Sequence, residues 1–143
     1  MLVRDLMVPT VLTVSPNDPV GEADKAMRET SDAAAVVLEE QSVVGILTEK
    51  TIAQAENDAI VRNVMQTDCA VIQPGASLAD ATRTMTEKGQ RFLPVVDGGL
   101  LVGIVSLPDI RKWAKDGGDP DKDEVQRVLT LEVHGYESQS PPT

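Results

Sequence analysis

The stretch GIVSLPDI, residues 103–110, recurs in altered form as GILTEKTI, residues 45–52. In both copies an apolar run ends at a hydroxyl residue, Ser106 or Thr48, which is typical of a strand that leads into a helix. Three residues after Ser106, Asp109 lies where a carboxylate favours the positive end of the helix dipole. Helix capping explains these side chains as well as a ligand site does, so the remaining sequence has to separate the two interpretations.

Two copies of one unit make up most of the chain. Residues 3–55 align with residues 61–113 without a gap, beginning with VRDLM over VRNVM. About twelve of roughly fifty aligned positions are identical, whereas composition alone predicts about three. A unit of about 55 residues is marginally stable by itself, so we expect the two copies to pack against each other.

Each copy predicts the element order β-α-β-β-α, which places the chain in the α+β class. A short extended piece and a proline precede an amphipathic helix, which Ser77 caps and Gly89 ends in the second copy. Two apolar strands follow and are joined by a tight polar turn. The apolar helix positions are Val20, Ala23 and Met27, then Leu78, Ala81 and Met85, and the strands cover 33–38, 43–47, 91–96 and 100–105.

Charge and composition exclude several functions. The 143-residue chain carries 23 Asp and Glu against 13 Lys and Arg, a net charge of −10 that repels nucleic acids and anionic membrane surfaces. Phe92, Trp113 and Tyr136 are its aromatic residues, too few for a base-stacking platform. Cys69 and His134 are each alone of their type, so we expect no metal site, disulfide or catalytic pair, and no enzyme. No apolar run approaches the roughly 18 residues of a membrane span, and we expect a cytoplasmic protein.

The motifs together resemble the cystathionine-beta-synthase (CBS) domain pair, also called a Bateman module. The resemblance rests on V-x-x-x-M at the start of each copy, a proline before the first helix, x-P-V-V-D on the second strand and G-I-V-S-x-x-D-I after the third. We accordingly expect a first repeat at 1–58, a second at 59–117 and an acidic, partly flexible tail at 118–143. Within this tail, VQRVLTLEV at 125–133 fits either a helix or an added strand.

The resemblance implies that the repeats pack sheet to sheet about a pseudo-twofold axis and leave two clefts. Such clefts often hold AMP, ADP, ATP or S-adenosylmethionine, as regulatory ligands and not as required cofactors. The family's T/S-x-x-D element places the aspartate on the ribose hydroxyls and the hydroxyl residue near the phosphates, and Ser106 and Asp109 match it in full. A carboxylate accepts two hydrogen bonds from a cis-diol, and the adjoining helix N-terminus favours phosphate.

Further site residues follow from the same resemblance. Arg91 and Lys50 match positions from which basic side chains contact phosphate. The adenine wall of the Asp109 cleft is expected to come from small residues of the first copy, namely Pro9, Thr10, Val11, Ala33, Ala34 and Ala35. The second cleft would contain Thr48, Thr51, Asp68 and Phe92. Because Thr51 replaces the aspartate, and one hydroxyl does not reproduce a charge-assisted contact with a diol, we expect this cleft to be empty or structural. We predict one strong site per chain.

Two functions fit these expectations. The first is a regulatory module that senses an adenosine-containing small molecule. The second is a ligand-free dimerising or adaptor module whose cleft is structural. We expect a homodimer formed through apolar helix surfaces, and any effector protein to act in trans. The residues expected on those surfaces are Ala23, Ala26, Met27, Ala81, Met85 and Trp113.

Overall fold

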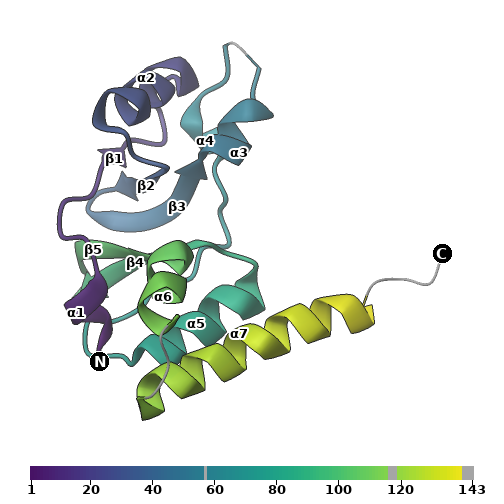
Figure 1. Ribbon diagram of the computed structural model, residues 1–143. Helices are drawn as coiled ribbons and strands as arrows, with labels where there is room; N and C mark the ends of the chain where they lie inside the picture. Colours follow the sequence, from purple (N-terminus) through teal and green to yellow (C-terminus); the bar gives the residue numbers. More distant parts are fainter. Residues whose placement is uncertain (57, 116–118, 140–143) are drawn as a thin grey trace.

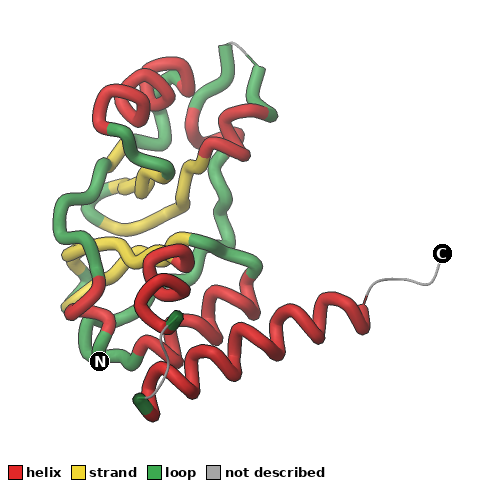
Figure 2. The backbone as a smooth tube through the Cα atoms, in the orientation of Figure 1, coloured by secondary structure: helices red, strands yellow, loops and turns green. Residues whose placement is uncertain are grey.

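Two small sheets face each other across the middle of the molecule, with helices on their outer sides (Figure 1 and Figure 2). The computed structural model describes residues 1–56, 58–115 and 119–139, and for 131–139 it describes the backbone alone. One sheet has the order β1-β2-β3, and in the other β4 pairs with β5. The strands are β1 (Thr13–Val14), β2 (Ala34–Glu39), β3 (Ser42–Thr48), β4 (Phe92–Asp97) and β5 (Leu100–Ser106). The expected α+β fold of two packed repeats is confirmed.

The helices of the repeats are positioned by their apolar faces. The main helix of each repeat buries the apolar residues that the helical spacing predicted, such as Ala23 and Met27 in the first repeat. The second of these helices is capped by Ser77, whose Oγ accepts a hydrogen bond from the Asp80 N–H at 3.0 Å, and is terminated by Gly89 with φ of 62°, as predicted. The helices are α1 (Val3–Leu6), α2 (Val20–Thr30), α3 (Glu49–Ala53), α4 (Val61–Val64), α5 (Leu78–Lys88), α6 (Leu107–Ala114) and α7 (Pro120–Gln139).

The N-terminal segment of each repeat packs on the other repeat. Val3 of α1 is fully buried in the core of the second repeat, and Val61 of α4 is fully buried in the core of the first. Val8 then pairs antiparallel with Ile104 at the edge of β5, while Gln66 pairs in the same way with Ile46. In Figure 1, α1 accordingly lies beside β5. The repeats visible in the sequence are therefore not the units that fold in space, because each core borrows a segment from the other copy.

Gly45 and Gly103 allow these exchanged segments to approach the sheets. A Cβ at Gly103 would lie 2.8 Å from Met7 Sδ and 2.9 Å from the Val8 carbonyl oxygen. A Cβ at Gly45 would lie 2.7 Å from Met65 Sδ in the same arrangement. The recurrence of methionine and glycine in both copies thus reflects one packing contact, in which the flexible thioether covers the strand backbone.

The segment that the sequence left open between helix and strand belongs to α7. This helix packs against α5 and α6, and its Val125 side chain is fully buried. Glu124 also pairs with Arg83 at 2.5 Å, and the N-terminal ammonium pairs with Asp121 at 2.6 Å. Beyond these contacts the helix extends away from the body of the molecule (Figure 1). Residues 116–118 and 140–143, which the sequence assigned to the junction and the end of the tail, lie outside the described residues.

Four of the six residues expected on a dimer surface are buried within the chain, while Ala26 and Trp113 are half-buried. Ala23 and Met27 are buried in the first core, and Ala81 and Met85 are buried in the second. Trp113 is half-buried against the second core, and Lys122 of α7 lies 5.6 Å from its ring centroid. The periodicity of these residues therefore reports burial within one chain.

Candidate functional site

A small pocket lies between the two repeats at the N-terminus of α6. It has a volume of about 140 Å³ and draws residues from both copies. The first copy contributes the segment before β1 and the start of β2, and the second contributes β4, β5 and α6. The described lining residues are Val8, Thr10, Val11, Leu12, Asp32, Ala33, Ala34, Phe92, Ile104, Ser106 and Asp109. Four members of the expected adenine wall, Thr10, Val11, Ala33 and Ala34, therefore lie together with Ser106 and Asp109.

Ser106 and Asp109 share the start of α6 but are engaged differently. The Ser106 Oγ accepts a hydrogen bond from the Asp109 N–H at 3.2 Å and caps the helix. The Asp109 residue is exposed. Within the described side chains its carboxylate forms no hydrogen bond or ion pair, so both of its oxygens remain available as acceptors.

Two expected members of the wall lie elsewhere. Ala35 is fully buried in the core of the first repeat, because alternate residues of β2 point to opposite faces of the sheet. Pro9 lines a separate hollow, which it shares with Leu38, Leu100 and other residues near the hairpin tips. Pro9 and Ala35 therefore do not line the pocket of Asp109 in this structure.

A larger cleft of about 610 Å³ surrounds Thr51. Thr48 and Thr51 close a reciprocal cap at the start of α3: the Thr51 Oγ1 accepts from the Thr48 N–H at 2.9 Å, and the Thr48 Oγ1 accepts from the Thr51 N–H at 3.3 Å. The Thr51 hydroxyl also donates to the Thr48 carbonyl at 2.8 Å. The described lining residues are Ala33, Ile46, Thr48, Glu49, Lys50, Thr51, Gln54, Gln66, Gly89, Gln90, Arg91, Phe92 and Pro108.

Lys50 and Arg91 belong to this Thr51 cleft and do not line the pocket of Asp109. Ala33 and Phe92 line both cavities, so the two cavities share a wall. Asp68, which the sequence placed in the second cleft, instead pairs with Lys88 at 3.2 Å on the surface.

The family model described as "CBS domain" matches the chain twice, at residues 3–58 and 61–116. The chain belongs to the CBS domain family. CBS domain-containing protein YhcV of Bacillus subtilis is 37% identical over 114 residues, which cover 76% of this chain and 81% of YhcV. An uncharacterized protein of Methanocaldococcus jannaschii, MJ1225, is 31% identical over 116 residues, which cover 77% of this chain and 41% of that relative.

Solved CBS structures share the same architecture. The CBS domain structure NE2398 superposes with a TM-score of 0.74 at 28% identity, covering 80% of this chain and 98% of that one. The CBS domain pair of MJ0100, solved with 5′-methylthioadenosine and S-adenosyl-L-methionine, gives a TM-score of 0.76 at 24% identity and covers 81% and 97%. CBSX2, solved with AMP, gives 0.69 at 24% identity and covers 80% and 96%. The latter two similarities concern the fold.

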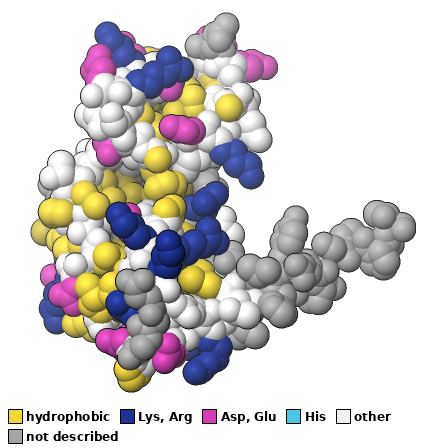
Figure 3. Space-filling view, in the orientation of Figure 1, with side chains coloured by type: hydrophobic (Ala, Val, Ile, Leu, Met, Phe, Trp, Pro, Cys, Tyr) yellow, Lys and Arg dark blue, Asp and Glu magenta, His cyan; other side chains and the backbone are white. Residues whose placement is uncertain are grey.

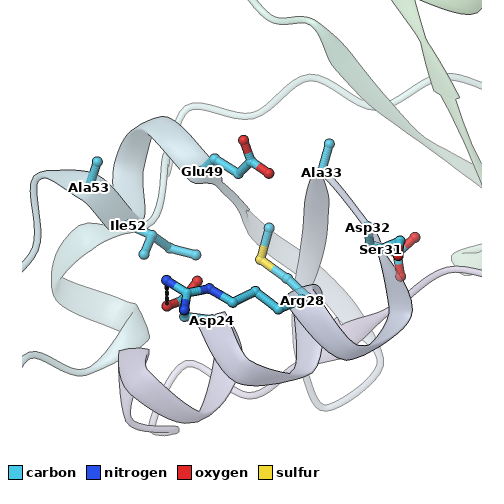
Figure 4. Close-up of a pocket in the computed structure, with 9 residues that line it drawn as sticks. Asp24, Arg28, Ser31, Asp32, Ala33, Glu49, Ile52 and Ala53 are labelled. Atoms are coloured by element: carbon cyan, nitrogen blue, oxygen red, sulfur yellow. Dashed lines mark ion pairs between the residues drawn. The ribbon is translucent and has the colours of Figure 1, made fainter.

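A third hollow in this CBS domain pair lies between α2 and α3 and has a volume of about 560 Å³ (Figure 4). Asp24 and Arg28 of α2, which form an ion pair at 2.9 Å, lie on one side, and Ile52 of α3 lies on the other. Ile110, which occupies the repeat position of Ile52, is fully buried in the core that α7 completes. The hollow is thus the part of the first repeat that corresponds to the surface covered by α7 in the second.

Several polar residues of the cavities escaped the sequence analysis, among them Asp32 and Gln90. Asp32 lines the Asp109 pocket and accepts a hydrogen bond from the Thr30 hydroxyl at 2.7 Å. Gln90, its counterpart in the repeat, is buried and bonds to the Ala70 N–H, the Ala70 carbonyl and the Phe92 carbonyl at 2.8–3.0 Å. The signal was present in the alignment of the copies, where a polar residue stands two positions before the second strand in both.

Burial raises the pKa of the Cys69 thiol to about 11, which keeps it protonated near neutral pH, and a thiol in that form is a poor nucleophile. No group of three or more potential metal ligands occurs among the described side chains. None of the described helices is long and apolar enough to cross a membrane.

Proposed function

We propose that this CBS domain pair is a regulatory module that binds an adenosine-containing ligand, AMP, ADP, ATP or S-adenosylmethionine, in the Asp109 pocket. The observation that carries the proposal is the Asp109 carboxylate, which faces a pocket built from both repeats and has no partner among the described side chains. Complexes of other CBS proteins with adenosine compounds, those of MJ0100 and CBSX2, support the ligand class.

Each part of the pocket fits one part of such a ligand. Asp109 accepts two hydrogen bonds from the ribose hydroxyls, and Ser106 lies at the N-terminus of α6, where N–H groups and the dipole favour a phosphate. The small side chains of Ala33 and Ala34 leave room for a flat base on the opposite side. Ligand binding then favours whichever arrangement of the repeats binds the ligand more tightly, which is the basis of regulation.

The proposal also covers the oligomeric state of the module, its cellular location and its partner. We infer that the module acts as a homodimer in the cytoplasm and signals to an effector protein in trans, as the resemblance to Bateman modules implies. It transmits a signal and does not catalyse a reaction.

A thermal-shift titration tests the proposal. Wild type, Asp109→Ala and the control Asp97→Asn, an exposed carboxylate in the β4–β5 hairpin, are titrated with AMP, ADP, ATP and S-adenosylmethionine, with GTP for comparison. A ligand at a hundred times its Kd stabilises the wild type by about 2.7 kcal/mol, a shift of several degrees in Tm. Asp109→Ala should weaken binding by about ten- to a hundredfold, because a charge-assisted contact is lost.

One result would refute the sensor, and another would refute the proposed role of Asp109. If none of the adenosine ligands shifts the Tm of the wild type, the cleft is structural and the module is a ligand-free adaptor. If the Asp109→Ala variant binds as tightly as the wild type and the Asp97→Asn control, the ligand does not use the ribose contact proposed here.

A further inference from the structure

We propose that Asp32 makes the Asp109 pocket selective for adenosine compounds that carry a positive charge, such as S-adenosylmethionine, over AMP, ADP and ATP. This selectivity rests on the proposed function and narrows its ligand class. Asp32 comes from the first repeat and Asp109 from the second, and the described lining of their common pocket contains no Lys or Arg. A charged ligand group held in this pocket therefore lies near two carboxylates.

The two cavities between the repeats differ at equivalent positions of the two copies. Asp109 and Asp32 occupy the repeat positions of Thr51 and Gln90, and both of these uncharged residues line the neighbouring Thr51 cleft. One cavity thus contains both carboxylates, whereas the other contains a hydroxyl and an amide in their place. The negative charge is a property of the Asp109 pocket and not of the repeat.

The Asp32 side chain is held in place where α2 ends. Ser31 terminates this helix in the left-handed conformation with φ of 58°, and the Asp32 N–H donates a hydrogen bond to the Met27 carbonyl at 2.9 Å. The Thr30 hydroxyl donates to Asp32 Oδ2 at 2.7 Å. Within the described side chains, Asp32 Oδ1 accepts no hydrogen bond and forms no ion pair. A carboxylate that is already ordered attracts a cation at a lower entropic cost than a mobile one.

The Lys and Arg side chains of the described residues lie outside this pocket. Lys50 and Arg91 line the neighbouring cleft, and Arg28 is paired with Asp24 at 2.9 Å. Figure 3 shows Lys and Arg side chains gathered across the middle of one face, but none of them is among the described lining residues of the Asp109 pocket. The chain as a whole has a net charge of −10, so its overall field adds to the two carboxylates.

The N-terminus of α6 opposes these carboxylates only weakly. The N–H of Leu107 donates to the Arg91 carbonyl at 2.8 Å, and that of Asp109 donates to Ser106 Oγ at 3.2 Å. Pro108, between them, has no N–H. The first three positions of α6 therefore hold no free N–H for a phosphate. The helix dipole remains, but it is equivalent to about half a positive charge, against two negative ones.

Isothermal titration calorimetry at low ionic strength tests the selectivity with adenosine, AMP, ATP, S-adenosylhomocysteine and S-adenosylmethionine. The last two differ by one methyl group and by the positive charge on sulfur, so the ratio of their Kd values measures the effect of charge. The test variant is Asp32→Asn, which keeps an acceptor for the Thr30 hydroxyl. The matched control is Asp97→Asn, which removes the same charge from an exposed position outside the pocket. Circular dichroism verifies that each variant is folded.

We expect S-adenosylmethionine to bind the wild type about tenfold more tightly than S-adenosylhomocysteine, and AMP and ATP to bind no more tightly than adenosine. In Asp32→Asn, S-adenosylmethionine should bind several-fold more weakly and AMP more tightly, because the charge that is removed attracts one ligand and repels the other. A variant that only damaged the pocket would weaken both. Asp97→Asn should leave every Kd close to that of the wild type.

The selectivity is refuted if the wild type binds S-adenosylmethionine and S-adenosylhomocysteine equally, or if Asp32→Asn changes the affinities for S-adenosylmethionine and AMP in the same direction. Either result leaves the proposed function intact as long as adenosine compounds bind and Asp109→Ala weakens their binding. If no adenosine compound binds the wild type, the proposed function fails and the selectivity fails with it.

Discussion

Gly103 and Gly45 show how one residue position sets the contact between the repeats. At each, the strand backbone meets a methionine of the exchanged segment, so no side chain fits. We predict that Gly103→Ala lowers the free energy of unfolding by about 1–3 kcal/mol, because the Cβ would overlap Met7 Sδ and the Val8 carbonyl. Urea denaturation measures the change. Gly21→Ala on α2, with open space around its Cβ, should instead stabilise by up to about 1 kcal/mol, and an equal loss in both variants would contradict the packing explanation.

At the scale of elements, α7 distinguishes the second repeat from the first. The helix covers α5 and α6, whereas the corresponding surface of α2 and α3 has an open hollow. We predict that Val125→Ala destabilises the chain by about 1–3 kcal/mol, since a fully buried side chain is truncated. Thermal unfolding followed by circular dichroism tests this. Arg127→Ala on the exposed side of α7 should change stability by no more than about 0.5 kcal/mol, and a neutral Val125→Ala would show that α7 is not needed for stability.

The whole molecule should unfold as one unit, because each repeat core contains a segment of the other copy. Val61→Ala truncates a side chain in the first core. We expect it to lower the Tm measured by Trp113 fluorescence, which reports on the second repeat, as much as the Tm measured by circular dichroism, which reports on the whole chain. Val71→Ala, which truncates an exposed valine, serves as the control and should leave both transitions nearly in place. Two separate transitions, with only the circular dichroism shifted, would show that the repeats unfold independently.

Most of the fold could be predicted, and some of the residues that line the Asp109 pocket, because their signals are local or repeated. The gapless repeat, the helical spacing of Ala81 and Met85, the cap at Ser77 and the stop at Gly89 all depend on residues close in the chain. Ser106 and Asp109 were recognisable as a candidate site because they match the family's T/S-x-x-D element within one short stretch. The helical state of residues 125–133 could not be predicted in this way. An apolar run of this length fits either a strand or a helix, and only the surface on which it packs decides between them.

The sequence by itself determined the α+β class, the two repeats and the position of the aspartate, because local periodicity and capping dictate them. Only the tertiary structure decided which side chains share a cavity. Lys50 and Arg91 line the Thr51 cleft, whereas Pro9 lines another hollow and Ala35 lies in the core of the first repeat. Only the tertiary structure also showed that α1 packs on the core of the second repeat and α4 on the core of the first. The physical reason is that these contacts join residues far apart in the chain, whose meeting depends on strand register and on how the sheets pack.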